Sequence, residues 1–411
     1  AAATLVLDLG AAPHGRAHDM ASARIAASKL PYVPGSHIPL LVDGLEPPYS
    51  LEVLGPAAIV RGALAIPSAP NGPSATVIAS NRYAMAMHRF DFAPPPSEDR
   101  AFIAVAAYDD GIVLHEDRAP YAALSILGIG GAPSDVAIDD NGRIAAGDTS
   151  GDSLLVAAMN PWEVREIAGV ALSDELAFDP SSHALFATDR DVSGSGALTR
   201  ITPEGLVTRR LLGLTSEGIA IDSKRHRVYV ANANDGTVSI VDATSLAEIR
   251  RFHAIDRAFS LALSSDGRRL FVVSNQSLSS LFGSAGRVVA FDVSSDAPHQ
   301  VARSAALAFP LGISADDERR TLFVTDERDD VVYVLNPLTL QASHRPLATC
   351  RTPWKPAVDS SDHRLYIPCA QSDLVDVFDT RSLKRIAGAP FRTGGYPLAV
   401  AVWHSNRRVV R

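Results

Sequence analysis

Aspartate and histidine recur at one spacing along the chain, and this pattern is the one most typical of acid–base chemistry. An Asp-x-x-x-His pair occurs three times: Asp179/His183, Asp222/His226 and Asp359/His363. A carboxylate that orients a histidine is the core of many general-base sites. In other segments, the histidine position carries an arginine: Arg143, Arg268 and Arg320. Because this position alternates between two residue types, we interpret it as a brace for a turn rather than as half of a catalytic dyad.

Four charged residues are the first candidates for an active site. Asp135, Glu175, Glu217 and Lys355 each stand at or near the beginning of a short apolar stretch. The corresponding positions of other stretches are apolar: Phe259, Leu311 and Leu398. If these stretches lie side by side, one arc is acidic and the other is apolar with one lysine, which suits a small amphiphilic or cationic ligand. The same residues could instead only pack against neighbouring elements, and the sequence leaves both interpretations open.

A second polar series stands where other apolar stretches end. Its members are Asp109, Asp148, Asp189, Asn232, Asn275 and Asp326. Such a series predicts either a ligand- or cation-binding face or side chains that cap their own turns, and we favour the caps. The segments Asp148–Ser153 and Asp189–Asp191 share some acidic positions with calcium loops but lack the terminal glutamate. We therefore predict no metal site and no cofactor, with calcium as the one cation to consider.

A repeated strand–turn–strand unit must position these residues. In Arg227–Asp242, β-branched residues flank an Asn-Asp-Gly turn, which is a strong hairpin signal. The unit recurs about every 40 residues, a period typical of propeller blades. Six segments read as first, inner strands of such blades: Ser134–Asp139, Asp174–Asp179, Glu217–Asp222, Phe259–Ser264, Leu311–Asp316 and Trp354–Asp359.

The seventh unit is split between the two ends of this region. Phe102–Ala107, Gly111–His115 and Ala122–Leu127 read as outer strands without an inner one, and Pro397–Trp403 reads as an inner strand with little after it. Joining the two parts closes a ring and removes unpaired sheet edges. The sequence thus predicts an all-β, seven-bladed β-propeller whose C-terminal strand completes the first blade.

The repeat is similar to that of a known propeller family. Tyr229–Asn232, followed by Gly236–Asp242, closely resembles the repeat of the YVTN-type β-propellers, which belong to the lactonase-like propellers. Leu322–Asp326, Val331–Leu335 and Leu365–Cys369 resemble it less closely. The resemblance covers roughly residues 101–403. It implies the propeller fold, and it leaves activity open because the family includes surface proteins, binding scaffolds and lactonase-like enzymes.

The N-terminal quarter has a different composition. We expect residues 1–35 to form a segment with a short helix over Ala17–Leu30, which Pro31 and Pro34 would end. Residues 36–97 contain several strand-like stretches separated by Pro and Gly turns, as in a small immunoglobulin-like β-sandwich. Residues 98–411 would then form the propeller.

The composition of the chain argues against some classes of function. The chain has 411 residues, of which 46% are hydrophobic and 20% are charged, with a net charge of −8. The acidic balance argues against a nucleic-acid partner, and no apolar run is long enough for a transmembrane helix. The opening Ala-Ala-Ala-Thr-Leu-Val is typical of a chain cut after a small-residue site, so we expect an exported protein, periplasmic or extracellular.

The two cysteines fit that expectation. In a propeller, Cys350 and Cys369 would adjoin on one face, and in an exported protein they would form a disulfide; the alternative is two separate buried thiols. The sequence contains no local catalytic motif. We therefore expect a non-catalytic scaffold that binds another protein, a surface or its own copies. The alternative is a lactonase-like hydrolase with its site at the channel mouth.

Overall fold

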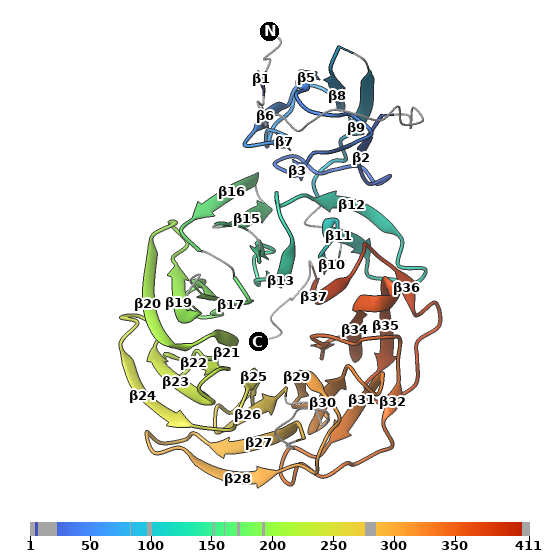
Figure 1. Ribbon diagram of the computed structural model, residues 1–411. Helices are drawn as coiled ribbons and strands as arrows, with labels where there is room; N and C mark the ends of the chain where they lie inside the picture. Colours follow the sequence, from blue (N-terminus) through green and yellow to red (C-terminus); the bar gives the residue numbers. More distant parts are fainter. Residues whose placement is uncertain are drawn as a thin grey trace.

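The computed structural model describes residues 5–6, 23–82, 84–96, 101–149, 151, 153–159, 161–170, 173–190, 194–275 and 285–404. These residues form antiparallel sheets and a single short 3-10 helix, η1 (Ala370–Ser372). In this part of the chain, no helix has the length and apolarity needed to span a membrane. Figure 1 shows the sheets after residue 101 arranged around a central axis, with the N-terminal sheets beside them.

Seven four-stranded sheets form the ring in the described part of the chain after residue 101. The first contains β10 (Phe102–Ala107), β11 (Gly111–Glu116), β12 (Ala123–Leu127) and β37 (Pro397–Trp403). The second contains β13 (Pro133–Ile138), β14 (Ile144–Asp148), β15 (Ser153–Met159) and β16 (Trp162–Ala168). The third contains β17 (Glu175–Phe178), β18 (Leu185–Arg190), β19 (Ser195–Ile201) and β20 (Val207–Leu214).

The remaining four sheets each use consecutive strands. The fourth contains β21 (Ser216–Asp222), β22 (Arg227–Asn232), β23 (Thr237–Asp242) and β24 (Glu248–His253). The fifth contains β25 (Ala258–Leu263), β26 (Arg269–Ser274), β27 (Arg287–Asp292) and β28 (His299–Arg303). The sixth contains β29 (Pro310–Asp316), β30 (Thr321–Asp326), β31 (Val331–Leu335) and β32 (Leu347–Ala348). The seventh contains β33 (Ala357–Asp359), β34 (Arg364–Cys369), β35 (Leu374–Asp379) and β36 (Phe391–Arg392).

The ring closes through its C-terminal strand. β37 pairs antiparallel with β10, with Phe102 opposite Trp403, so the first sheet joins both ends of the ring-forming region. The inner strands β13, β17, β21, β25, β29, β33 and β37 contact one another in succession, and β37 returns to β13. We call the face on which these strands begin the strand-start face, and the opposite face the strand-end face.

Burial between neighbouring sheets holds the ring together. The second strands β22, β26, β30 and β34 are almost wholly buried, and the β-branched and aromatic residues of each pack on the adjacent sheet. Each such side chain removed from water contributes about 1.5–3 kcal/mol. The outer strands are more exposed, as β24 and β28 show.

The N-terminal sheets pack on the first sheet of the ring. They comprise β1 (Leu5–Val6), β5 (Ser50–Leu54), β8 (Ser74–Ser80) and β9 (Met85–Asp91); β2 (Arg24–Ala26) and β4 (Leu41–Asp43); and β3 (His37–Pro39), β7 (Ala63–Ala65) and β6 (Ala58–Val60). Ile126 of β12 lies in their core, and its backbone bonds to Pro31 and Val33. Trp162 of the second sheet donates to the Pro34 carbonyl at 2.9 Å.

The short helix expected near the N-terminus is wrong in the part that the structure describes. Of the helix expected over residues 17–30, residues 17–22 lie outside the described part of the chain. In the remainder, Arg24–Ala26 form β2, paired with β4. Ile25 explains the difference, because it is buried between two exposed neighbours, and this period-2 pattern is that of a strand at a sheet surface.

Candidate functional site

Three of the four charged residues singled out in the sequence meet on the strand-start face. The Lys355 ammonium lies 3.7 Å from a carboxylate oxygen of Asp135 and 3.7 Å from one of Glu175. It donates a hydrogen bond of 2.9 Å to the Asp174 carbonyl. All three side chains are largely buried, with exposed fractions of 16%, 8% and 17% for Lys355, Asp135 and Glu175. We call these three residues the cross-ring cluster.

The cluster spans the middle of the ring. Asp135 lies on β13 and Glu175 begins β17, in adjacent sheets, whereas Lys355 precedes β33 in the seventh sheet. Two inner strands, β37 and β13, separate β33 from β17 on the shorter way around. Lys355 therefore reaches across the axis of the ring rather than along its wall.

The backbone around Lys355 is fixed from several sides. Its N–H donates to the Leu398 carbonyl at 3.3 Å, and the Trp354 carbonyl accepts from the Thr325 hydroxyl at 2.7 Å. Gly312 permits this approach, because a Cβ there would come within 2.8 Å of the Lys355 Cα. The lysine side chain is thus aimed at the opposite wall by its tightly packed backbone.

The acidic partners are positioned by the second and third sheets. Asp135 accepts a hydrogen bond of 2.8 Å from the Leu176 N–H, which links β13 to β17. Thr188 accepts from the Glu175 N–H at 3.1 Å and donates to the Glu217 carbonyl at 2.6 Å. Glu217 contributes its negative charge to the electrostatics of Lys355 and helps to raise the pKa of the lysine.

Burial and charge together set the protonation of the cluster. Burial, with repulsion from Asp135 and Asp174, raises the pKa of Glu175 to about 7, although Lys355 opposes the shift. Burial also raises the pKa of Asp135, and Lys355 again acts in the opposite direction. Burial lowers the pKa of Lys355, but Asp135 and Glu175 outweigh this effect and raise it above its usual value. Lys355 is therefore charged at neutral pH, and Glu175 is poised between its two forms.

The second polar series is largely engaged in hydrogen bonds within the protein. Asp189 accepts from Thr199 and Arg209, Asn232 bonds Ser216 and Ser239, and Asp326 accepts from the Phe309 N–H. Asp148 accepts from the Ala132 N–H, and Asn275 accepts from Arg257. Asp109 is exposed, and its N–H donates to the Gly395 carbonyl. Asp152 and Asp191, from the two calcium-like segments, lie outside the described residues.

The Asp-x-x-x-His pairs are turn elements. His183, His226 and His363 have φ angles of 54°, 53° and 54°, and the equivalent Arg320 has 49°. A left-handed backbone thus occurs at this position in four of the six turns between first and second strands, and in the turns of Arg143 and Arg268 the preceding Gly142 and Gly267 adopt it instead. The aspartates bond elsewhere: Asp179 to serines, Asp222 to Arg225, and Asp359 to His404.

The disulfide expected from the sequence is confirmed. Cys350 and Cys369 are bonded, with their Cα atoms 5.7 Å apart. Cys369 ends β34, and Cys350 lies in the connection that leads to β33, so the bond staples the strand-start face of the seventh sheet beside Lys355.

No family model matches the chain. It is 29% identical over 97 residues to the uncharacterised protein YncE of Salmonella typhimurium, a match covering 24% of this chain and 27% of that protein. The chain therefore matches only about a quarter of the length of this curated relative.

Comparison with solved structures gives matches that cover more of the chain. A candidate 6-phosphogluconolactonase from Bacteroides fragilis superposes with a TM-score of 0.61 at 11% identity, covering 76% of this chain and 100% of that one. The β-propeller domain of Cps50 (Swd1) from Myceliophteria thermophila superposes with a TM-score of 0.57 at 13% identity, covering 69% and 94%. At such identities, the likeness establishes the fold alone. This chain has the all-β fold of the β-propeller proteins.

Proposed function

We propose that this protein is an exported, non-catalytic binding scaffold built on a seven-bladed propeller of the YVTN type. In this proposal, residues 1–35 are an N-terminal segment, residues 36–97 are a small β-sandwich, and residues 98–411 are the propeller. The scaffold acts by binding another protein chain, either a different partner or a second copy of itself.

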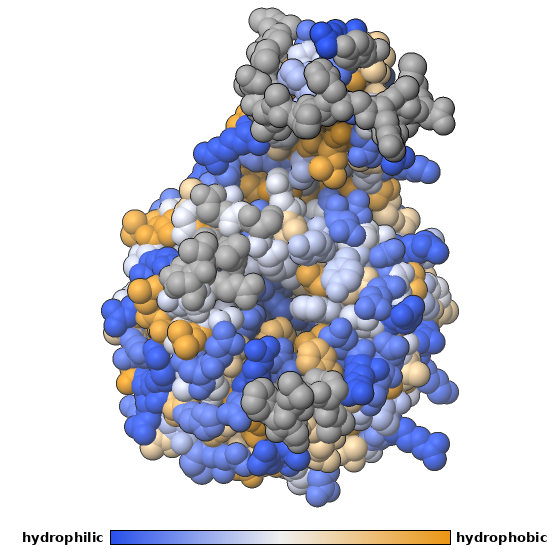
Figure 2. Space-filling view, viewed as in Figure 1, coloured by the Kyte–Doolittle hydropathy of each residue, from blue (hydrophilic) through white to orange (hydrophobic). Residues whose placement is uncertain are grey.

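The observation that carries the proposal is the outer strand of the third sheet. Among the described strands, β20 pairs only with β19, so no strand covers its other edge, although the Leu214 backbone at its end bonds to Asn234 and Asp235. Four large aliphatic side chains lie exposed there: Leu206, Val207, Leu211 and Leu214, with exposed fractions of 65%, 37%, 58% and 50%. Figure 2 shows hydrophobic surface on the rim over this sheet. We call this strand and these four residues the β20 edge.

The neighbouring outer strands have fewer exposed aliphatic residues than β20, although β20 also contains the exposed Arg209 and Arg210. β24 (Glu-Ile-Arg-Arg-Phe-His) and β28 (His-Gln-Val-Ala-Arg) carry mostly charged or polar exposed residues. Charge on an edge strand discourages pairing with another chain, whereas a long apolar edge favours it. β20 is longer than either strand, with eight residues against six and five.

The cross-ring cluster supports a non-catalytic role. Its lysine is shared among two carboxylates and a carbonyl, and Asp135 is also bonded to backbone. A buried, mutually compensated group of charges suits the fixing of a structure.

Light scattering on the natively purified protein tests the scaffold. We expect a mass above that of a single 43.5 kDa chain, or a co-purifying chain identified by mass spectrometry. Leu211→Glu should abolish that association. Ile249→Glu, at a similarly exposed aliphatic residue on β24, should leave it intact. A single-chain mass for the wild type, with no co-purifying chain, would remove the basis of the proposal.

The second candidate is a lactone hydrolase, favoured by Glu175 alone. A carboxylate with a pKa of about 7 beside a buried lysine is a suitable general base. We expect, on this alternative, turnover of a member of a lactone panel and its loss in Glu175→Gln with folding intact. Absence of turnover across the panel would eliminate the alternative.

A further inference from the structure

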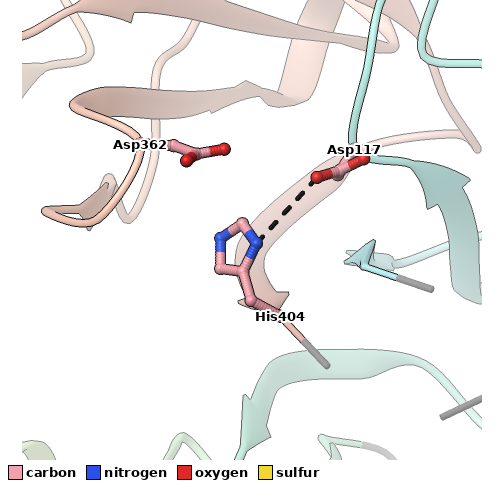
Figure 3. A group of neighbouring side chains, drawn as sticks. All are labelled: Asp117, Asp362 and His404. Carbon is pink, nitrogen blue, oxygen red and sulfur yellow. Dashed lines mark ion pairs between the residues drawn. The ribbon is translucent and has the colours of Figure 1, made fainter. Parts of the chain in front are cut away.

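A second group of ionisable residues lies on the strand-end face, where the ring closes. Asp117 follows β11, Asp362 lies in the turn between β33 and β34, and His404 follows β37. One possible ligand atom from each lies within 4.8 Å of the others. Figure 3 shows the three side chains converging from these separate segments, with the imidazole between the carboxylates. We call this group the closure cluster.

A neighbouring carboxylate orients the histidine. The Nε2 atom of His404 lies 2.6 Å from an Asp359 oxygen, and the Nδ1 atom lies 3.9 Å from Oδ2 of Asp117. Asp359 is itself held by hydrogen bonds from the Ser361 N–H and hydroxyl. In the neutral imidazole, a proton on Nε2 bonded to Asp359 leaves the lone pair on Nδ1, facing the closure cluster. A carboxylate that holds the far nitrogen in this way is the usual second partner of a metal-binding histidine.

The carboxylates offer oxygen atoms to the same point. The Asp117 side chain is only 13% exposed, and Arg118 approaches its other oxygen, Oδ1, at 3.9 Å. Oδ2 therefore faces His404. Arg364 donates to the backbone carbonyl of Asp117 rather than to its carboxylate. Asp362 is exposed at a turn and can rotate toward the other two ligands.

The donor set selects a class of ion. One imidazole nitrogen and two carboxylate oxygens suit divalent transition metals such as Zn²⁺ or Mn²⁺, which would balance the two negative charges. Metal–ligand bonds of about 2.0–2.2 Å place neighbouring ligands about 3.3 Å apart. The 3.9 Å between Nδ1 and Oδ2 is slightly longer, and the ligand atoms of all three residues lie within 4.8 Å of one another, so side-chain rotations would have to bring them closer to a bound ion.

We propose that Asp117, Asp362 and His404 bind a divalent transition-metal ion that links the end of β37 to the end of β11 in the same sheet and to the seventh sheet. The ion would add a bond at the junction where β37 closes the ring. This inference is independent of the proposed scaffold function, because it concerns a different face and different residues.

Titration of the untagged, chelator-treated protein with zinc chloride at about pH 8 tests the site, since an alkaline pH favours the neutral imidazole. We expect one high-affinity ion per chain by calorimetry and elemental analysis. We also expect a zinc-dependent rise in the midpoint of thermal unfolding. Asp362→Asn should weaken binding by at least about tenfold and remove that rise, because it deletes one of three ligands. Without metal, its unfolding midpoint should equal that of the wild type.

Asp317→Asn is the matched control. Asp317 is an exposed aspartate in the equivalent turn of the sixth sheet, and the closure cluster does not include it. It should bind zinc as the wild type does. Replacement of His404 is a poor first test, because it also breaks the bond to Asp359. Equal zinc affinity in Asp362→Asn and the wild type would overturn the proposal, as would the absence of binding by the wild type.

Discussion

Lys355 provides positive charge next to two buried acids at the centre of the ring. It is the cation that faces both Asp135 and Glu175, and all three side chains are mostly removed from solvent. Burying charges is costly, and removal of one partner leaves the others uncompensated. The cross-ring cluster is therefore the residue-scale feature on which we expect stability to depend most strongly.

Lys355→Met should lower the free energy of unfolding by about 3–5 kcal/mol, because it leaves two buried acids without a cation. Urea unfolding measures the change. The triple variant Lys355→Met, Asp135→Asn, Glu175→Gln should recover much of the loss, since it removes the charges together. If Lys355→Met unfolded at the wild-type urea concentration, the cluster would not have this role.

Stability should also depend on pH through Glu175. Its pKa in the folded protein is raised to about 7 from an ordinary 4.5. Between these values, the folded state binds more protons than the unfolded chain, so the free energy of unfolding falls as pH rises. The full shift corresponds to at most ~3 kcal/mol, present below pH 4.5 and lost as pH passes 7.

Comparison with Glu175→Gln isolates this contribution. Asp359 raises the pKa of His404, which gives a slope of the same sign, so only the difference between the two proteins is informative. Wild-type stability should decline relative to the variant from about pH 4.5 to 7. Parallel profiles across that window would contradict the assignment.

At the scale of the element, we expect the stability of the seventh sheet to depend on its disulfide bond. Its inner strand β33 has three residues and its outer strand β36 has two, so the ladder provides few hydrogen bonds. The bond from Cys350 to Cys369 closes a loop across this short sheet.

Removal of the disulfide should lower the free energy of unfolding by about 3 kcal/mol, which is the value that the chain-entropy model gives for a closed loop of about 20 residues. The double variant Cys350→Ala, Cys369→Ala should unfold at lower urea concentration than the oxidised wild type. A reducing agent should bring the wild type to the level of the variant and leave the variant unchanged. Two thiols that react in the unreduced, unfolded wild type would show that the bond does not form.

At the scale of the whole molecule, ring closure rests on β37. This strand supplies the inner edge of the first sheet, and Trp403 packs against Phe102 with ring centroids 5.6 Å apart. The first sheet also carries the N-terminal sheets, so closure and the attachment of the N-terminal region share one element.

Deletion of residues 397–411 should therefore prevent cooperative folding, because β10 loses one of its two partners and its inner edge is left unpaired. Near-ultraviolet circular dichroism and size-exclusion chromatography would detect the loss. Deletion of residues 405–411 alone keeps β37 and serves as the control. A compact, cooperatively unfolding product of the longer deletion would show that closure is dispensable.

The sequence by itself determined the repeat and the strands that carry it. Alternating β-branched residues around polar turns identify strands locally, because burial on a sheet has a period of two. The same periodicity located β37 as the missing inner strand of the first sheet, and it placed Asp135, Glu175 and Lys355 at strand starts. The disulfide also followed, since strand order alone brings Cys350 near Cys369.

Only the tertiary structure decided which charges meet. Lys355 is 180 positions from Glu175 in sequence, and their contact depends on the diameter of the closed ring and on the direction of a long side chain. Sequence reasoning missed His404 for the same reason: Asp117 is far from it in sequence and Asp359 belongs to the seventh sheet, and Asp359 instead suggested a pairing with His363. Local sequence patterns predict strands because the alternation of buried and exposed residues is visible within a few positions. A site assembled across a ring depends instead on distances between residues that are far apart in sequence, and only folding sets these distances.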